Sequence, residues 1–316
     1  AQCLVGSEMC IRDRECSNVW RKENREVHKF LRAIGFSDIT KKDLEMILDE
    51  VITRPEIMKI TKDSEGNEFA ELSGSFAANA GITVRGTYQE DDSFHMDYYY
   101  PYVFGTSITT NEQIDVEKHA EKESYAGVCD EVNLGVTLIF YIQNVADYLA
   151  ETNRHLSKIH YGAMLAGLST EGKILCPVVE RKKNDVPAIQ KNDRHNQLIA
   201  QAREGDEDAI ESLTLEDMDT YALLSQRVMK EDIFSIVKST FMPFGIESDQ
   251  YTVLGEIIDC VTMENKLTHE KLYGMKLLCN NIQFDVCINE KDLLGEPAIG
   301  RRFRGNVWMQ GNLCLE

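Results

Sequence analysis

The stretch that most constrains the fold is residues 250–316, where apolar runs of strand length follow one another with turn residues between them. The runs are YTVLGEIIDCVT, KLYGMKLLC, IQFDVCI and FRGNVWMQGNLCL. Short strand-like runs at such spacing are typical of a small barrel or a compact sheet. We therefore expect a small β-rich domain at residues 250–316, with an OB-like barrel as one option.

Residues 27–180 combine two hydrophobic periods. Thr40, a residue type that caps helices, begins TKKDLEMILDEVI, whose apolar residues recur at helical spacing. ITVRGTY (82–88) and FHMDYYY (94–100) instead alternate on either side of a polar turn. Such alternation around a turn predicts a β-hairpin.

Two further patterns lie in the same range. YGAMLAGLS and KILCPVV flank Thr170, Glu171 and Gly172, which predicts a second hairpin at these residues. GVTLIFYI is a strand candidate that runs into a helix through NVADYLAETNR. Hairpins mixed with helices indicate an α+β domain over residues 27–180.

A charged connector, ERKKNDVPAIQKNDRHN, follows this domain and leads into a helical stretch rich in carboxylates. Pro243 and Gly245 end that stretch. The predicted class is therefore α+β, in three parts. They are a mixed hairpin and helix domain at 27–180, a connector with an acidic helical segment at 181–245, and the β-rich domain at 250–316. No internal repeat is visible.

The opening residues fit none of these patterns. CLVGSEMCIRDR, residues 3–14, resembles the translation of an adapter used to prepare sequencing libraries, and residues 15–26 then read as translated upstream bases. We expect residues 1–26 to be a disordered, non-native leader. The expected native start is Val27, directly before HKFLRAIGF.

Charge and cysteine use limit the classes of partner and location. The net charge of −19 argues against general binding to nucleic acid or anionic membranes, because phosphates are repelled at long range. The longest apolar run, GVTLIFYI, falls far short of the roughly 20 residues that span a bilayer. Cysteines are scattered singly and no secretory signal is visible, so a cytoplasmic location is expected.

Motifs for catalysis are weak. His119-Ala120-Glu121 has the H-x-E form of zinc deaminases, but the P-C-x-x-C that such a site needs is missing, so a polar loop is the better interpretation. GEPAIGRR lacks the lysine and hydroxyl residue of a phosphate-binding loop. We therefore expect no metal and no cofactor. If the chain is an enzyme, His119, Glu121, Glu123 and Cys129 are the first residues to test.

Three clusters are candidate binding surfaces, and each has a structural alternative. They are the tyrosines Tyr98, Tyr99 and Tyr100, the carboxylates Asp206, Glu207 and Asp208, and the arginines Arg301, Arg302 and Arg304. The tyrosines can form core or an exposed recognition patch. The carboxylates fit the first turn of a helix or a docking surface for a basic protein. The arginines can contact a nucleic-acid backbone if they lie on an OB-like barrel.

Several long runs occur together in order, among them HKFLRAIGF, DYYYPYVFGT, REGDEDAIESLTLEDMDTY and GEPAIGRRF. In these runs the chain resembles an uncharacterised family of clostridial (Firmicutes) proteins, the domain of unknown function DUF3881, over residues 27–316. The resemblance implies no activity, cofactor or catalytic residue.

Three functional hypotheses remain open. The first is a non-catalytic interaction or regulatory protein that binds a protein partner. The second is a small-ligand-binding protein or enzyme with a pocket at the domain junction. The third and weakest is nucleic-acid binding by the C-terminal barrel.

Overall fold

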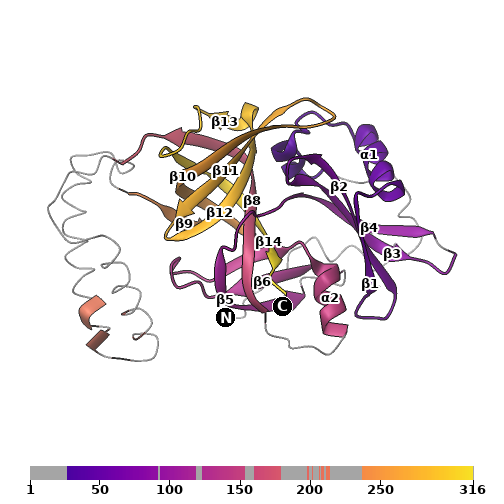
Figure 1. Cartoon of the computed structure of the whole chain (residues 1–316), viewed down its shortest axis with the longest axis horizontal. Helices are drawn as coiled ribbons and strands as arrows, with labels where there is room; N and C mark the ends of the chain where they lie inside the picture. Colours follow the sequence, from indigo (N-terminus) through magenta and orange to yellow (C-terminus); the bar gives the residue numbers. More distant parts are fainter. Residues whose placement is uncertain are drawn as a thin grey trace, which may run out of the picture.

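The computed structural model describes residues 27–91, 93–118, 123–153, 160–178 and 237–315, with residues 198, 201, 206, 208–209 and 211–213 between them. Within these residues the chain is mostly β-strand with a few helices, which agrees with the expected α+β class at the coarse level (Figure 1). The predicted leader and most of the predicted acidic helical segment lie outside the described residues.

A four-stranded antiparallel sheet forms one layer of the molecule, in the order β1-β2-β3-β4 (Figure 1). Its strands are β1 (Ile57–Lys62), β2 (Glu68–Ala77), β3 (Ala80–Tyr88) and β4 (Phe94–Val103). The antiparallel pairing of β3 with β4 confirms the hairpin predicted from residues 82–100.

The helices η1 (Lys29–Ile34) and α1 (Lys41–Thr53) precede this sheet. Helix α1 forms as predicted, because the side chain of Thr40 accepts a hydrogen bond from the backbone of Asp43 and apolar residues recur along one face. That face packs against apolar residues of β2 and β3, so α1 covers one side of the sheet.

The remaining strands form a second, larger sheet. Their bounds are β5 (Thr110–Lys118), β6 (Tyr125–Cys129), β7 (Leu138–Ile142), β8 (His160–Leu175), β9 (Thr240–Pro243), β10 (Gln250–Glu264), β11 (Lys271–Cys279), β12 (Ile282–Asn289), β13 (Leu293–Leu294) and β14 (Arg302–Leu313). Helix α2 (Val145–Asn153) lies between β7 and β8, and the short helix η2 (Glu290–Asp292) follows β12. The strands and helix predicted from GVTLIFYI, NVADYLAETNR and the four C-terminal runs are confirmed.

The pairings of the larger sheet close into two rings that share the antiparallel pair β8–β14. One ring runs β8-β14-β10-β11-β12, and the other runs β8-β14-β7-β6-β5. Strands from residues 27–180 and from 250–316 therefore belong to one sheet.

The two rings have the same connectivity. In each, a three-strand meander (β5-β6-β7 or β10-β11-β12) is followed in the chain by a long strand, β8 or β14. The first strand of each meander pairs antiparallel with its own long strand, and the last pairs parallel with the other long strand. This internal symmetry has no visible counterpart in the sequence.

The hairpin predicted around Thr170, Glu171 and Gly172 is wrong. Strand β8 continues through these residues without a turn, because β14 pairs with it along almost its whole length. A Cβ atom at Gly172 would lie 2.4 Å from Cε2 of Phe303 on β14. Gly172 thus leaves room for an aromatic ring of the neighbouring strand. Glycine within a strand can mark such a close approach, not only a bend or a turn.

Two clusters of buried apolar side chains hold these layers together. One joins strands of both rings and includes Phe140, Leu165, Phe284 and Phe303. The other joins η1, α1 and the four-stranded sheet to β8, β12 and β14, where Trp308 stacks on the ring of Phe30 at 5.2 Å. None of the helices with described residues is long and apolar enough to cross a membrane.

Candidate functional site

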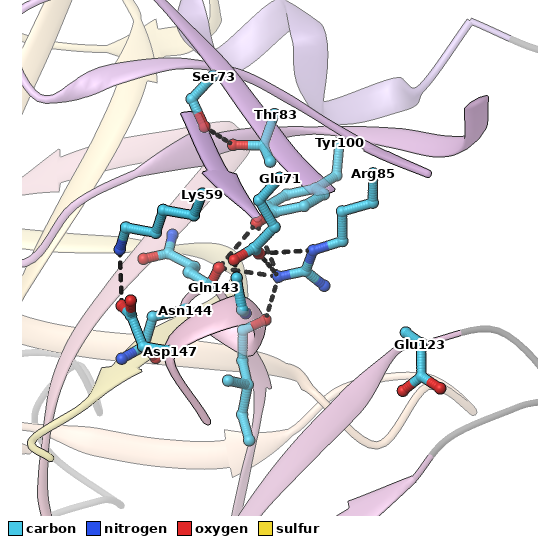
Figure 2. A network of polar contacts seen from close by, with 12 residues as sticks. Lys59, Glu71, Ser73, Thr83, Arg85, Tyr100, Glu123, Gln143, Asn144 and Asp147 are labelled. Atoms are coloured by element: carbon cyan, nitrogen blue, oxygen red, sulfur yellow. Dashed lines mark hydrogen bonds and ion pairs between the residues drawn. The ribbon is translucent and has the colours of Figure 1, made fainter. Parts of the chain in front are cut away.

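The face of the four-stranded sheet away from α1 carries two rows of mostly polar side chains. Strand register aligns them across β1 to β4 as Lys59, Glu71, Arg85 and Tyr98 in one row, and as Ile57, Ser73, Thr83 and Tyr100 in the other. Alternation along each strand puts both rows on the same face of the sheet. This face lies toward the end of β7 and the start of α2, as Figure 2 shows.

Arg85 lies at the centre of this face and is fully buried. Within its own sheet, Nε donates to Oε1 of Glu71 at 2.8 Å, Nη1 donates to the hydroxyl of Tyr98 at 2.9 Å, and Nη2 donates to the hydroxyl of Tyr100 at 3.1 Å. The guanidinium also lies over the Tyr100 ring at 4.8 Å. A buried charge is tolerated when it is paired and hydrogen-bonded in this way.

The same guanidinium reaches across to the second sheet. It donates to the hydroxyl of Tyr141 at 2.7 Å, to the carbonyl of Ile142 at 3.0 Å and to the carbonyl of Gln143 at 2.8 Å. Glu71 makes a parallel link, because its Oε2 accepts from the backbone N–H of Ala146 at 2.7 Å. The Arg85–Glu71 pair therefore fixes the end of β7 and the start of α2 against the four-stranded sheet.

Arg85 stays charged, and Tyr100 and Tyr141 stay neutral. Burial alone lowers the pKa of Arg85, but the surrounding tyrosines and Glu71 raise it well above its usual value. Burial raises the pKa of Tyr100 and of Tyr141, and this outweighs the attraction of Arg85 for a phenolate. These groups are consequently donors and acceptors of fixed protonation over the physiological pH range.

A cavity of about 330 Å³ lies beside this network, between the two sheets. Its polar lining includes Lys59, Glu71, Thr83, Gln143, Asn144 and Asp147, and its apolar lining includes Ile57, Phe104, Met164 and Leu313. Lys59 and Asp147 form an ion pair at 2.6 Å across β1 and α2, and each side chain is about two-fifths exposed, at 42% and 40%. Figure 2 shows this pair on the side of the network where the Gln143 amide lies.

Gln143 is the unusual member of this lining. Its Nε2 donates to the carbonyl of Val103 at 2.9 Å and to Oε1 of Gln310 at 2.7 Å, while the residue is only 5% exposed. Its own Oε1 is buried and has no hydrogen-bond partner among the residues that the structure describes. Buried polar atoms in proteins are nearly always paired, so this unpaired acceptor, on a residue that lines the cavity, is an exception.

The predicted tyrosine patch is divided between the two faces of β4. Tyr98 and Tyr100 point to Arg85, whereas Tyr99 lies on the α1 side and accepts from the backbone N–H of His28 at 3.0 Å. Tyr100 also lines the cavity.

Of the residues predicted for catalysis, the described Glu123 and Cys129 do not line the cavity. Glu123 accepts from Ser64 at 2.6 Å and from Lys118 at 2.9 Å, and it also bonds the hydroxyl of Tyr125. Burial raises the pKa of Glu123, but these hydrogen bonds outweigh it and lower the pKa overall. Burial raises the pKa of Cys129 to about 11, so its thiol is not a ready nucleophile. His119 and Glu121 lie outside the described residues.

The predicted charged clusters lie elsewhere. Arg302 is buried and donates to the carbonyls of Cys176 and Val237, whereas Arg301 is exposed and donates to the carbonyl of Glu296. Arg304 lines a separate cavity of about 360 Å³. Asp206 and Asp208 are exposed, and Oδ1 of Asp206 accepts from the backbone of Asp208 as a helix cap does. Glu207 lies outside the described residues.

Sequence reasoning missed Arg85, Glu71 and Gln143. One signal was present, since ITVRGTY places a single arginine among the apolar residues of a strand. A buried cation of that kind requires a partner, but the pattern alone does not say which carboxylate supplies it.

The fold and this cavity define a mostly β protein in which a buried ion pair holds two sheets together. A cavity with polar and apolar lining lies between the sheets. The chain belongs to the family whose model is described as "Domain of unknown function, E. rectale Gene description (DUF3881)", which matches residues 31–311 and confirms the resemblance found in the sequence. No curated protein and no solved structure matches the chain. In the described residues no group of histidine, cysteine and carboxylate side chains is arranged to hold a metal ion.

Proposed function

We propose that the protein binds a small polar molecule in the cavity between the four-stranded sheet and the β7–α2 segment. The observation that carries this proposal is the open acceptor Oε1 of Gln143. Leaving a buried acceptor unpaired costs about 1–3 kcal/mol, and a donor from a bound ligand removes that cost.

The surroundings of the cavity support binding. Its volume of about 330 Å³ falls at the lower end of the range, roughly 300–1,000 Å³, that small-molecule sites occupy. The Arg85–Glu71 pair and the two hydrogen bonds from Gln143 Nε2 hold the lining in place before a ligand arrives. Such preorganisation reduces the entropy lost on binding.

Of the hypotheses from the sequence, we therefore favour a small-ligand-binding protein with a pocket at a junction over a protein that binds a partner through its surface. Tyr98 and Tyr100, candidates for such a surface, are engaged with Arg85. No histidine or cysteine is among the described residues that line the cavity. Binding of a small molecule is therefore the function we propose.

Two neighbouring residues on β1 give a matched test. Ile57 and Met58 are both exposed, at 43% and 49%, and lie on opposite faces of the strand, but only Ile57 lines the cavity. We expect a metabolite library to contain compounds that raise the melting temperature of the wild-type protein and of Met58→Trp. Ile57→Trp should lose that response because the indole fills the cavity. A library without any stabilising compound, or an unchanged response in Ile57→Trp, would overturn the proposal.

We further propose an OB-like architecture for the ring β8-β14-β10-β11-β12 and a cytoplasmic location. Support for the first is a circuit of five strands with one parallel pair, β12–β8. Support for the second is that six cysteines in the described residues are free, and burial raises the pKa of Cys279 and Cys287 to about 12.

A further inference from the structure

We infer that the ligand is a zwitterion of the α-amino-acid class with an apolar side chain. Its carboxylate binds Lys59, and its ammonium group binds Asp147 and Oε1 of Gln143. This inference rests on the proposed function and adds the chemical class of the ligand.

The charges that remain available in the cavity support a ligand with both signs. Glu71 is already occupied, since it pairs with Arg85 and accepts from the Ala146 backbone. Lys59 and Asp147 pair with each other but keep about two-fifths of their side-chain surface exposed, so each retains donors or acceptors. A ligand with a single charge would pair with either Lys59 or Asp147. It would remove water from the other side chain without giving it a partner of opposite charge.

The open oxygen of Gln143 selects the cationic end of the ligand. An amide oxygen accepts hydrogen bonds and donates none, so it discriminates against a carboxylate and favours an ammonium or another N–H group. Asp147 lines the same cavity and is the carboxylate there that is not engaged with Arg85. An ammonium group can donate to both, because it carries three N–H bonds.

The apolar part of the lining and the volume limit the rest of the ligand. Ile57, Phe104, Met164 and Leu313 contribute carbon surface on which an aliphatic side chain can be buried. A cavity of about 330 Å³ suits a single amino acid better than a nucleotide or a folded peptide.

Leucine and two analogues that each lack one charge form the direct test. We expect isothermal titration calorimetry on the full chain to detect binding of at least one of alanine, valine, leucine and methionine. If leucine binds, 3-methylbutylamine, which lacks the carboxylate, and 4-methylpentanoate, which lacks the amine, should each bind at least about tenfold more weakly.

Substitutions of the two charged residues have close controls in the same chain. Asp147 is the third residue of α2 and Asp43 the third residue of α1, so Asp147→Asn and Asp43→Asn change matched positions. Lys59 and Lys62 lie on opposite faces of β1, and only Lys59 lines the cavity. We expect Asp147→Asn and Lys59→Met to weaken amino-acid binding about tenfold, with Asp43→Asn and Lys62→Met unchanged.

Three results would overturn the inference. They are equal binding of leucine and a singly charged analogue, unchanged binding in both cavity variants, and the failure of every tested amino acid to bind. If other library compounds still raise the melting temperature of the wild type and of Met58→Trp, but not that of Ile57→Trp, the proposed function stands. Only the inferred ligand class is then wrong.

Discussion

Arg85 carries a full positive charge at a place that water does not reach, and six oxygen atoms receive its hydrogen bonds. Two of these oxygens are backbone carbonyls at the end of β7, three are phenols, and one belongs to Glu71. Only the carboxylate is charged, so the pair is neutral as a whole. The phenols and carbonyls satisfy the remaining N–H groups, which is the condition under which a buried ion pair is stable.

Arg85→Met is expected to destabilise the protein by about 3–5 kcal/mol, because the change leaves Glu71 as an unpaired buried carboxylate. Urea denaturation followed by fluorescence measures this loss. The double variant Arg85→Met/Glu71→Leu should lose less than the sum of the two single variants, since no unpaired charge remains. Additive losses would mean that the two side chains do not act as a pair.

His28 makes stability depend on pH. Burial, with a smaller contribution from Lys29, lowers the pKa of His28 from 6.5 to about 4, and its ring nitrogen caps η1 by accepting from the backbone of Phe30. The unfolded chain takes up a proton near pH 6.5 and the folded chain does not until about pH 4. Stability is therefore fully present above pH 6.5 and falls, by up to about 3 kcal/mol, as the pH drops to 4.

His28→Phe should remove the loss of stability that protonation of His28 causes at low pH. Midpoints of urea unfolding between pH 7 and pH 4 measure this change. His95→Phe is a control, because that side chain is 68% exposed. Carboxylates that titrate in the same range affect all three proteins alike. Parallel pH profiles for wild type and His28→Phe would show that His28 is not the responsible group.

At this scale the sequence allowed only part of the site to be predicted. The run of tyrosines and the alternation that separates Tyr99 from its neighbours could be read from spacing. The partners of Arg85 could not, because Glu71 lies 14 positions away and Tyr141 lies 56 positions away. Local pattern carries no information on which distant residues meet.

Among the elements, α1 could be predicted from the sequence. For β8, the two strand-like runs could be predicted, but not that they form one continuous strand. Helix α1 depends on a cap and a period within its own residues. The glycine in β8 looked like a turn signal, because the ring of Phe303 that it accommodates is supplied by a strand more than a hundred residues later. Glycine marks both tight turns and close approaches, and sequence alone does not separate them.

Gly172→Ala is expected to destabilise the protein by about 1–3 kcal/mol, because the new Cβ would lie 2.4 Å from the ring of Phe303. Thermal or chemical unfolding measures the change. Phe303→Leu in the same chain should recover part of the loss by removing the ring that clashes. A Gly172→Ala protein as stable as wild type would show that the close approach is absent.

In the whole molecule, the β8–β14 pair is the element on which both rings depend. Each long strand is hydrogen-bonded on both sides, β8 by β14 and by β5 or β12, and β14 by β8 and by β10 or β7. The two meanders and the four-stranded sheet are built around it. The shared connectivity arises from long-range pairing, which explains why no repeat in the sequence predicts it.

We expect backbone amides of residues 163–169 and 305–311 to exchange with deuterium more slowly than those of β1 to β4. Their hydrogen bonds open only when both rings open, whereas edge strands such as β1 can fray alone. Hydrogen exchange with mass spectrometry resolves these segments. Faster exchange in β8 and β14 than in the four-stranded sheet would contradict the central place of this pair.

The sharing of strands also has a consequence for how the chain is synthesised. Among the described strands β14 leaves the ribosome last, yet neither ring closes without it. Until it emerges, β7, β8 and β10 present unpaired backbone edges, which invite pairing with other chains. These edges therefore stay unpaired until translation has passed β14. During synthesis each molecule is open to pairing with other chains over an interval that ends only when β14 pairs.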